Sequence, residues 1–258
     1  MQVQDERTQE VSTESLQQQV DALMAENLLL KEQLARKEQF AAMIAHELRG
    51  PLTPIINYAQ IVARSNPRRE NIERATHIII SQAWRLTRLA KDLLDASHLS
   101  SGRFTLTCRT CDVVRLIKDV VEQARPVAPY HTLAIEVPDR PIVGEWDAGR
   151  LEQALGNLLD NAIKYSDEGT TITVQAWQTE LAAHISVHNQ GVNIPAEQRN
   201  QLFHPCTRLP GGSTQQGTGL GLYITKSIVE AHGGELRLEQ ADESEPGTTF
   251  MFDLPLGK

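Results

Sequence analysis

The sequence has few aromatic residues, few cysteines, no long apolar run and no basic cluster, and these shortages exclude several classes of protein. Aromatic residues make up 5% of the 258 residues, so we expect mostly aliphatic packing. The formal net charge is −8, and Arg68-Arg69 is too short a basic cluster to favour nucleic acid as the main partner. No apolar run approaches the roughly 20 residues that cross a bilayer, and no signal peptide opens the chain. The sequence therefore predicts a cytoplasmic protein without a membrane span.

Three cysteines fit a reducing compartment, although Cys108 and Cys111 have CxxC spacing. A structural zinc site would need two further ligands at short spacing. The remaining cysteine, Cys206, lies far along the chain. We therefore interpret the pair as two small residues at a strand edge, with metal or redox chemistry as the alternative.

A seven-residue repeat near the N-terminus predicts a parallel, two-stranded coiled coil over residues 1–36. Its members are spaced alternately four and three residues apart: Leu16, Val20, Leu23, Asn27, Leu30 and Leu34. Asn27 falls at an a position, where a polar side chain fixes register and strand number at some loss of stability. A solvated single helix is the alternative. We expect a homodimer whose coiled coil transmits a signal from an upstream or separate sensor.

The same frame places His46 at an f position, facing away from the seam, so we expect its side chain to be exposed. Pro51 and Pro54 follow within the helical pattern and predict a kink just after the histidine. We expect the helix to resume to about residue 64, a turn at 65–68 and a second helix over about 69–97. Two such hairpins in a dimer form a four-helix bundle, which we assign to residues 37–101.

From residue 102 onward the pattern changes to short strands that alternate with helices. The expected strands are Arg103–Thr107, Leu133–Val137, Thr171–Thr179, Ala182–His188, Glu235–Gln240 and Thr248–Leu254. The expected helices are Asp112–Arg125, Asp147–Asn161, Ala196–Leu202 and Leu220–His232. Residues 102–258 are thus predicted to form an α+β domain, with helices on one face of a mostly antiparallel sheet.

Four motifs occur in one order along the chain. They begin at His46 (HELRGPLT), Asn157 (NLLDNAIKY), Gly217 (GTGLGL) and Gly247 (GTTF). In this order and spacing the chain resembles the sensor histidine kinases, with a HisKA-class phosphoacceptor domain before an ATP-binding domain of the GHKL type. The resemblance extends from about Leu34 to the C-terminus. It implies an α/β-sandwich ATP-binding domain, ATP and Mg²⁺ as cofactors, and a response-regulator receiver domain as partner.

In the second motif, Asn157, Asn161 and Lys164 lie three and four residues apart, so one helical face presents them together. Amide oxygens suit Mg²⁺, which takes hard oxygen ligands, and a lysine suits a phosphate oxygen. By resemblance, Asn161 is the principal Mg²⁺ ligand, Asn157 assists, and Tyr165 also belongs to the nucleotide site. The alternative is a helix that exposes ordinary polar residues.

The glycine-rich turn suits phosphates because glycines leave backbone N–H groups free at the start of a helix. The expected nucleotide-binding residues here are Gly217, Thr218, Gly219, Leu220 and Gly221, with Thr248 from the last motif. The loop between Phe203 and Gly217 has the composition of a lid over ATP. Within it, Arg208 matches a family arginine, which we expect to steady the γ-phosphoryl charge. An exposed loop arginine is the alternative.

At the phosphoacceptor, the neutral imidazole of His46 is the expected nucleophile. Glu47 is placed to accept the proton of the other ring nitrogen, which keeps the lone pair of the attacking nitrogen free. Adjacent helical residues diverge, so this contact needs a favourable rotamer.

The sequence departs from the family pattern at three places. Asn189 stands where the family has the Asp that binds the adenine amino group, and Asn193 replaces a glycine two residues after the retained Gly191. An amide keeps an acceptor but loses the charge, which weakens the bond by roughly 1 kcal/mol. Gly50 stands where kinases that also dephosphorylate their partner carry Thr or Asn. We therefore expect kinase activity with poor phosphatase activity.

Three functions follow from these patterns. The first is a dimeric histidine autokinase, and the second is a degenerate kinase that acts as a dimeric signalling scaffold, favoured by Asn189 and Asn193. The third is another ATPase of the same nucleotide-binding fold, such as a chaperone or mismatch-repair ATPase. Such ATPases lack an exposed histidine motif on a coiled coil immediately upstream.

Overall fold

The computed structural model describes residues 2–63, 69–101, 103–191, 193–199, 201–205, 207, 218–239 and 247–256. The predicted turn at 65–68 lies outside these residues, as do Arg208, Gly217 and most of the predicted lid. The chain divides into two compact units, 1–50 and 51–258, and each is described by itself.

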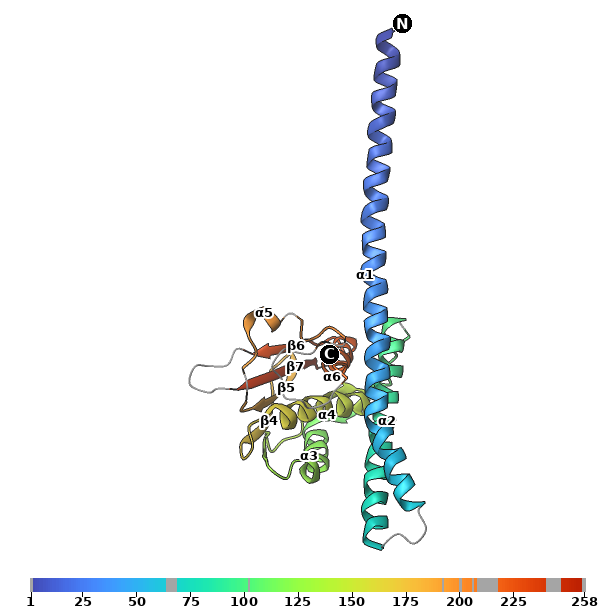
Figure 1. Cartoon of the computed structure of the whole chain (residues 1–258). Coiled ribbons are helices and arrows are strands. Elements are labelled where there is room, and N and C mark those ends of the chain that lie inside the picture. Colours follow the sequence, from blue (N-terminus) through green and yellow to red (C-terminus); the bar gives the residue numbers. More distant parts are fainter. Residues whose placement is uncertain are drawn as a thin grey trace. The chain divides into compact units, whose positions relative to one another are not determined.

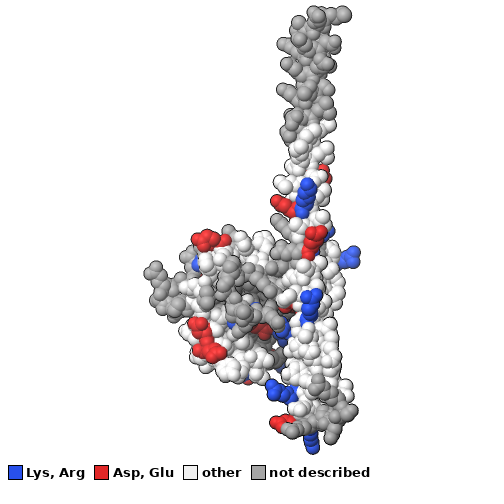
Figure 2. Space-filling model, viewed as in Figure 1, with Lys and Arg blue, Asp and Glu red and all other residues white. Residues whose placement is uncertain are grey.

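Helix α1 spans Gln2–Val62 and continues through Pro51 and Pro54. In the first unit the predicted seam is an exposed apolar stripe: Val20 is 41% exposed, Leu23 63% and Leu34 57%. An uncovered stripe at heptad spacing is compatible with a coiled-coil partner, and pairing stays a prediction. Figure 2 shows acidic and basic side chains interspersed along the described part of this helix, without a block of one sign.

The second unit begins with the end of α1 and with α2, which spans Arg69–Ser100. The second helix ends three residues later than predicted. Its buried residues include Ala75, Leu89 and Ala96, spaced at multiples of seven. This spacing keeps one face of α2 apolar.

A five-stranded sheet forms the centre of the domain after α2, in the order β2-β4-β5-β7-β6. Its strands are β2 (Thr132–Glu136), β4 (Thr171–Gln178), β5 (Ala182–Asn189), β6 (Leu236–Glu239) and β7 (Thr248–Pro255). The β2–β4 pair is parallel and the other pairs are antiparallel, so the sheet is mostly antiparallel, as predicted. In the register of β5, Asn189 pairs with both Ile172 and Thr248.

The domain's helices are α3 (Val113–Ala124), the 3-10 helix η1 (Arg125–Val127), α4 (Ala148–Tyr165), α5 (Ala196–Arg199) and α6 (Gly221–Ala231). Helix α4 packs between α3 and α6 and contacts β5 (Figure 1). Its apolar side chains, including Leu151, Leu155 and Leu158, are fully buried with Ile185 and Ile224. The predicted α+β class is confirmed.

One predicted strand is wrong. Residues 103–107 form no strand, because the Thr107 N–H donates to the Asp147 carboxylate at 2.8 Å instead of to a neighbouring strand. The strand lies further on, at β1 (Arg109–Asp112), and pairs antiparallel with β3 (Val143–Trp146), which was not predicted.

Two predicted helix ends also differ. Helix α4 runs on to Tyr165, past the predicted end at Asn161, and Ser166 N–H still donates to the Ala162 carbonyl. Helix α5 ends at Arg199, and residues 201–203 are turn. Across the described part of the chain, no helix is long and apolar enough to cross a membrane.

Candidate functional site

Helix α4 is held at its N-terminus by Asp147. The Asp147 carboxylate accepts from the N–H of Arg150 at 3.2 Å and from that of Thr107 at 2.8 Å. The Asp147 N–H donates to His232 Nε2 at 3.0 Å, which ties α4 to the end of α6. Burial raises the pKa of Asp147, but the two backbone hydrogen bonds and the Arg150 charge outweigh it and leave the pKa below its ordinary value.

The two asparagines of the second motif lie on the half-buried side of α4. Asn157 Nδ2 donates to the Gly221 carbonyl at 3.2 Å, next to Thr225 Oγ1 at 3.5 Å. The Asn157 amide oxygen accepts no hydrogen bond from the residues that the structure describes. The Asn161 side chain makes no hydrogen bond to any residue that the structure describes. Both asparagines thus keep an amide oxygen for a ligand.

These oxygens fit a hard cation such as Mg²⁺, which binds few protein oxygens and keeps waters or phosphate oxygens as its other ligands. Within the described ranges, no three His, Cys, Asp or Glu side chains are grouped so that they could hold a metal ion. Asn157 and Asn161 could supply amide oxygens to such a cation.

Lys164 and Tyr165 contact one another at the end of α4. Lys164 Nζ lies 3.0 Å from the Tyr165 hydroxyl and 4.7 Å from the centre of its ring. Tyr165 is 43% exposed. The Lys164 ammonium thus remains near the surface, one helical turn after Asn161, where it can meet a phosphate.

The glycine-rich turn leads directly into α6. Gly219 adopts φ +66°, a left-handed conformation that favours glycine. The Thr218 hydroxyl accepts from Leu220 N–H at 3.1 Å, and Leu220 is fully buried at the start of the helix. The positive end of α6 therefore lies at Gly221, beside Asn157.

Asn189 lies at the end of β5, 4% exposed, and its side chain makes no hydrogen bond to another described residue. Thr248, its pairing partner on β7, is 6% exposed. Gly191, two residues after Asn189, lies against the end of α4. A Cβ at this residue would lie 2.1 Å from the Tyr165 carbonyl oxygen. The structure thus brings the end of α4, the Asn189 stretch and the last glycine motif together.

Asn193 has a role that sequence reasoning missed. Its Oδ1 accepts from Gly247 N–H at 3.0 Å, and so joins the Asn189 stretch to the last glycine motif. Gly247 itself has φ +152° and passes so close to the Asn189 carbonyl that a Cβ would lie 2.3 Å from it. Asn193 stands where the family pattern has glycine, and its side chain therefore makes a hydrogen bond that a glycine could not make.

In the first unit, the His46 side chain is 68% exposed, as its heptad position predicted. His46 Nδ1 lies 3.5 Å from Oε1 of Glu47, whose side chain is only 4% exposed. A buried carboxylate on the Nδ1 side leaves Nε2 as the outward nitrogen.

A polar network between α2 and α4 was not predicted. Asp95 is 4% exposed and accepts from Arg150 Nη1 and from Gln153 Nε2, each at 2.7 Å. Arg88 of α2 pairs with Asp160 of α4. The partners lie more than 50 residues apart, and no sequence motif links them. The network anchors the helix that carries Asn157 and Asn161.

The CxxC pair lies at strand β1, and Cys111 lines a hollow together with Asp147 at the start of α4. Cys108 is exposed, Cys111 is half-buried at strand β1, and both are free thiols. Burial, followed by the charge of Asp112, raises the pKa of Cys111 above its ordinary value. A raised pKa disfavours the reactive thiolate.

Two domain families match the chain. Residues 36–102 match the His Kinase A (phospho-acceptor) domain, and residues 146–258 match the histidine kinase-, DNA gyrase B-, and HSP90-like ATPase. Together they contain all four motifs.

Individual relatives agree with these matches. The probable sensor histidine kinase TcrY of Mycobacterium tuberculosis is 35% identical over 84% of the chain and 46% of the relative. A solved mycobacterial sensor histidine kinase, MprB, is 31% identical, with a TM-score of 0.52 over 58% of the chain and 97% of that structure. Full-length ShkA in complex with AMPPNP is 25% identical, with a TM-score of 0.63 over 86% of the chain and 46% of ShkA. The chain spans less than half the length of TcrY and ShkA.

Proposed function

The chain belongs to the sensor histidine kinases, and we propose that it transfers the γ-phosphoryl group of ATP to His46 and then to an aspartate of a response-regulator receiver domain. The observation that carries the proposal is the His46–Glu47 pair. An exposed imidazole has one ring nitrogen beside a buried carboxylate, so its other nitrogen is free to attack.

The nucleotide site is proposed to be built by α4, the glycine-rich turn and the end of β5. Asn161 and Asn157 would hold Mg²⁺, and Lys164 would meet a phosphate oxygen. Asn189, Tyr165, Gly191 and Thr248 are proposed to surround the base, because the structure gathers them and leaves the Asn189 amide without a described partner. AMPPNP bound to ShkA supports a nucleotide of this class.

The glycine-rich turn is proposed to bind the phosphates with the residues Gly217, Thr218, Gly219, Leu220 and Gly221. The positive end of α6 at this turn supports the assignment. Arg208 is proposed, by resemblance, to steady the charge of the transferred group. When bound, Mg²⁺ neutralises negative charge on the phosphates.

In the transfer step, His46 Nε2 attacks the γ-phosphorus while the bond from that phosphorus to the bridging oxygen breaks, and ADP leaves. A new N–P bond forms. The proton on Nδ1 stays between the imidazole and Glu47, whose carboxylate offsets the positive charge that develops on the ring. A receiver-domain aspartate then attacks the phosphorus, which restores the neutral imidazole.

Organisation and location follow as parts of the same proposal. Residues 1–36 would form a signal-transmitting coiled coil, 37–101 the dimerisation and phosphoacceptor domain, and 102–258 the ATP-binding domain. The exposed apolar stripe through Leu23 and Leu34 supports a homodimer. We propose a cytoplasmic kinase core that receives its signal from a sensor.

A nucleotide-independent signalling scaffold is the second candidate. Asn189 favours it, because a neutral amide holds the base amine less strongly than a carboxylate does. The Asn193–Gly247 hydrogen bond favours the kinase over the scaffold, because it preserves the geometry around Asn189.

The test is autophosphorylation of the purified chain with γ-labelled ATP and Mg²⁺. Wild type should acquire acid-labile label, and His46→Ala should acquire none. His98→Ala, at another exposed histidine, is the matched control and should label normally. Label that survives His46→Ala would refute His46 as the acceptor. Absence of label from wild type, with no binding of a fluorescent ATP analogue, would establish the scaffold instead.

A further inference from the structure

The parallel edge of the sheet ends early. Strand β2 stops at Glu136, which pairs with Gln175, whereas β4 continues to Gln178. The chain after β2 then reaches Pro138, which has no backbone N–H with which to extend the ladder. The last three residues of β4 therefore have a strand on one side only.

The backbone groups at this edge can be assigned a direction. Thr179 N–H donates to the Ala182 carbonyl at 2.9 Å, so the peptide groups of Thr179 face β5. Successive residues of a strand alternate between its two neighbours, so Ala176 and Gln178 face the side of β2. The pairing of Gln175 with Glu136 occupies the Ala176 N–H with the Glu136 carbonyl, so the Ala176 carbonyl and both backbone groups of Gln178 face the open edge. The Thr170 carbonyl accepts from Thr132 of β2 at 3.1 Å, in agreement with this alternation. No described residue donates to the backbone carbonyl of Gln178 or accepts from its N–H.

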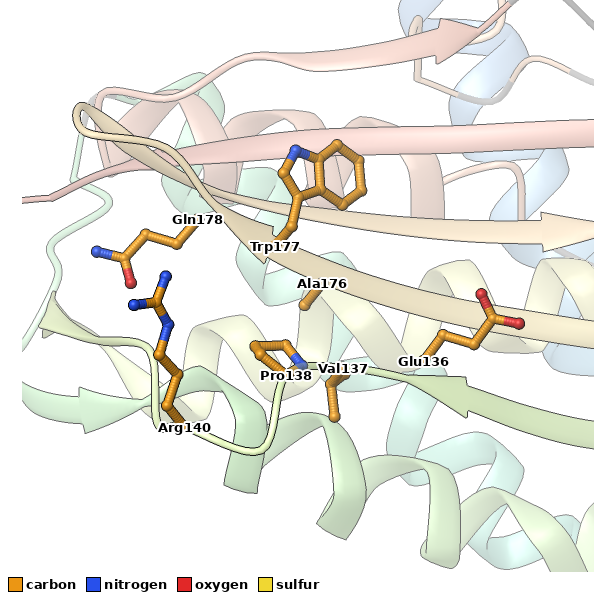
Figure 3. A pocket seen from close by; sticks show the side chains of 7 residues that line it. All are labelled: Glu136, Val137, Pro138, Arg140, Ala176, Trp177 and Gln178. Atoms are coloured by element: carbon orange, nitrogen blue, oxygen red, sulfur yellow. The ribbon is translucent and has the colours of Figure 1, made fainter.

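A hollow of about 420 Å³ lies along this edge. Its lining residues are Glu136, Val137, Pro138, Arg140, Ala176, Trp177 and Gln178. Figure 3 shows Arg140 and Gln178 at one end, Glu136 at the other, and Pro138, Val137 and Ala176 between them. We call this hollow the β4 edge pocket.

The charged groups of the β4 edge pocket are not equivalent. The Glu136 carboxylate already accepts from Gln175 Nε2 at 2.7 Å. Arg140 is exposed and makes no ion pair or hydrogen bond with any other residue that the structure describes. The negative charge of the pocket therefore lies at the Glu136 end, and its positive charge, without a described ion-pair partner, lies at the Gln178 end (Figure 3).

We propose that the β4 edge pocket binds an extended segment of a partner protein that carries an Asp or Glu side chain. The segment pairs with the Ala176 carbonyl and with the N–H and carbonyl of Gln178, and so continues the sheet where β2 stops. Three residues of β4 span about 10 Å, so three or four residues of the partner fill the edge. Its carboxylate meets the Arg140 guanidinium, whose planar fork donates two parallel hydrogen bonds to the carboxylate oxygens.

The test is a selection of displayed random heptapeptides on the immobilised full chain. Each enriched peptide is then synthesised with a fluorophore, and its affinity is measured by anisotropy. We expect enrichment of β-branched sequences with at least one acidic residue. Arg140→Glu should weaken their binding at least tenfold, and replacing the acidic residue of the peptide by Lys should do the same.

The backbone contribution is tested at Gln178. Gln178→Pro removes an N–H that faces the open edge and leaves the hydrogen bonds to β5 in place, so the fold should persist by circular dichroism. Peptide binding should be lost in this variant and kept in Gln178→Ala, which retains the N–H. If the proline variant does not fold, the Arg140→Glu comparison decides alone.

Three outcomes overturn the proposal. One is no enrichment above uncoated beads, and another is peptides that bind wild type and Arg140→Glu equally. The third is association of the chain beyond a dimer that Gln178→Pro abolishes, because the edge would then belong to a second copy of the chain.

Discussion

Asp92 of α2 allows a stability prediction that depends on pH. Burial, reinforced by the charges of Asp95 and Asp160, raises the pKa of Asp92 from 3.8 to about 6, although Arg88 and Lys91 oppose the shift. The folded protein therefore holds this proton to a higher pH than the unfolded chain does. Asp92 costs no stability below about pH 4, and its ionisation destabilises the fold as the pH rises through 6.

The change Asp92→Asn removes the ionisable group and keeps the shape of the side chain. A shift of about two units corresponds to at most about 3 kcal/mol, at roughly 1.4 kcal/mol per unit. Asp92 is partly exposed, so solvent screening reduces the expected gain to about 1–2 kcal/mol above pH 7. Below about pH 4 the variant and wild type should be nearly equal in stability, and the difference should grow between about pH 4 and 6.

The measurement is urea denaturation of both proteins at several values between pH 3.5 and 8. The transition of wild type should move to lower urea, relative to the variant, as the pH rises from about 4 to 6, and the separation should then stay constant. Asp119→Asn, at an exposed carboxylate of α3, is the control and should show no such trend. A stability difference that is the same at pH 3.5 and pH 8 would refute the reasoning, because an uncharged polar effect does not depend on pH.

Three further predictions concern single side chains. Asp147→Ala should lower the free energy of unfolding by about 1–2 kcal/mol, because α4 loses its N-cap. Urea denaturation at pH 7 measures this loss. Asp147→Asn, which keeps a capping oxygen, should retain most of the stability. Gly191→Ala should destabilise by about 1–3 kcal/mol, because the new Cβ meets the Tyr165 carbonyl, and titration with a fluorescent ATP analogue should show weaker binding. Gly50→Thr should raise the rate at which the chain dephosphorylates its phosphorylated receiver partner and leave labelling of His46 unchanged. Equal dephosphorylation rates in both proteins would contradict the role assigned to Gly50.

Much of the fold was predictable because local patterns determine it. The helix expected from Asp147 begins within one residue of α4, and the strands expected at 182–188 and 248–254 agree with β5 and β7 to within one residue. The end of α4 was missed because Lys164 and Tyr165 are compatible with either a helix or a loop. Strand β3 was missed because it is four residues long and contains Gly144.

In the candidate site, too, some residues can be identified from the sequence and others only from the structure. Asn157, Asn161 and the glycine-rich turn could be found in the sequence, because motif spacing places them on a helix face and at a helix start. The contacts of Asp95 with Arg150 and Gln153 could not, because they depend on the packing of α2 against α4. Asn193 was identified only as a departure from glycine, and its hydrogen bond to Gly247 needed the three-dimensional arrangement.

The continuity of α1 has a mechanical consequence. His46 follows Asn27 by 19 residues within this one helix, a rise of about 28 Å at 1.5 Å per residue. A helix resists twisting about its own axis, so a torque applied near Asn27 reaches His46 with little loss. A shift of register by one residue would turn the imidazole through about 100°, which is sufficient to point it in a different direction. In this respect the helix transmits a rotation about its own axis instead of a translation along it.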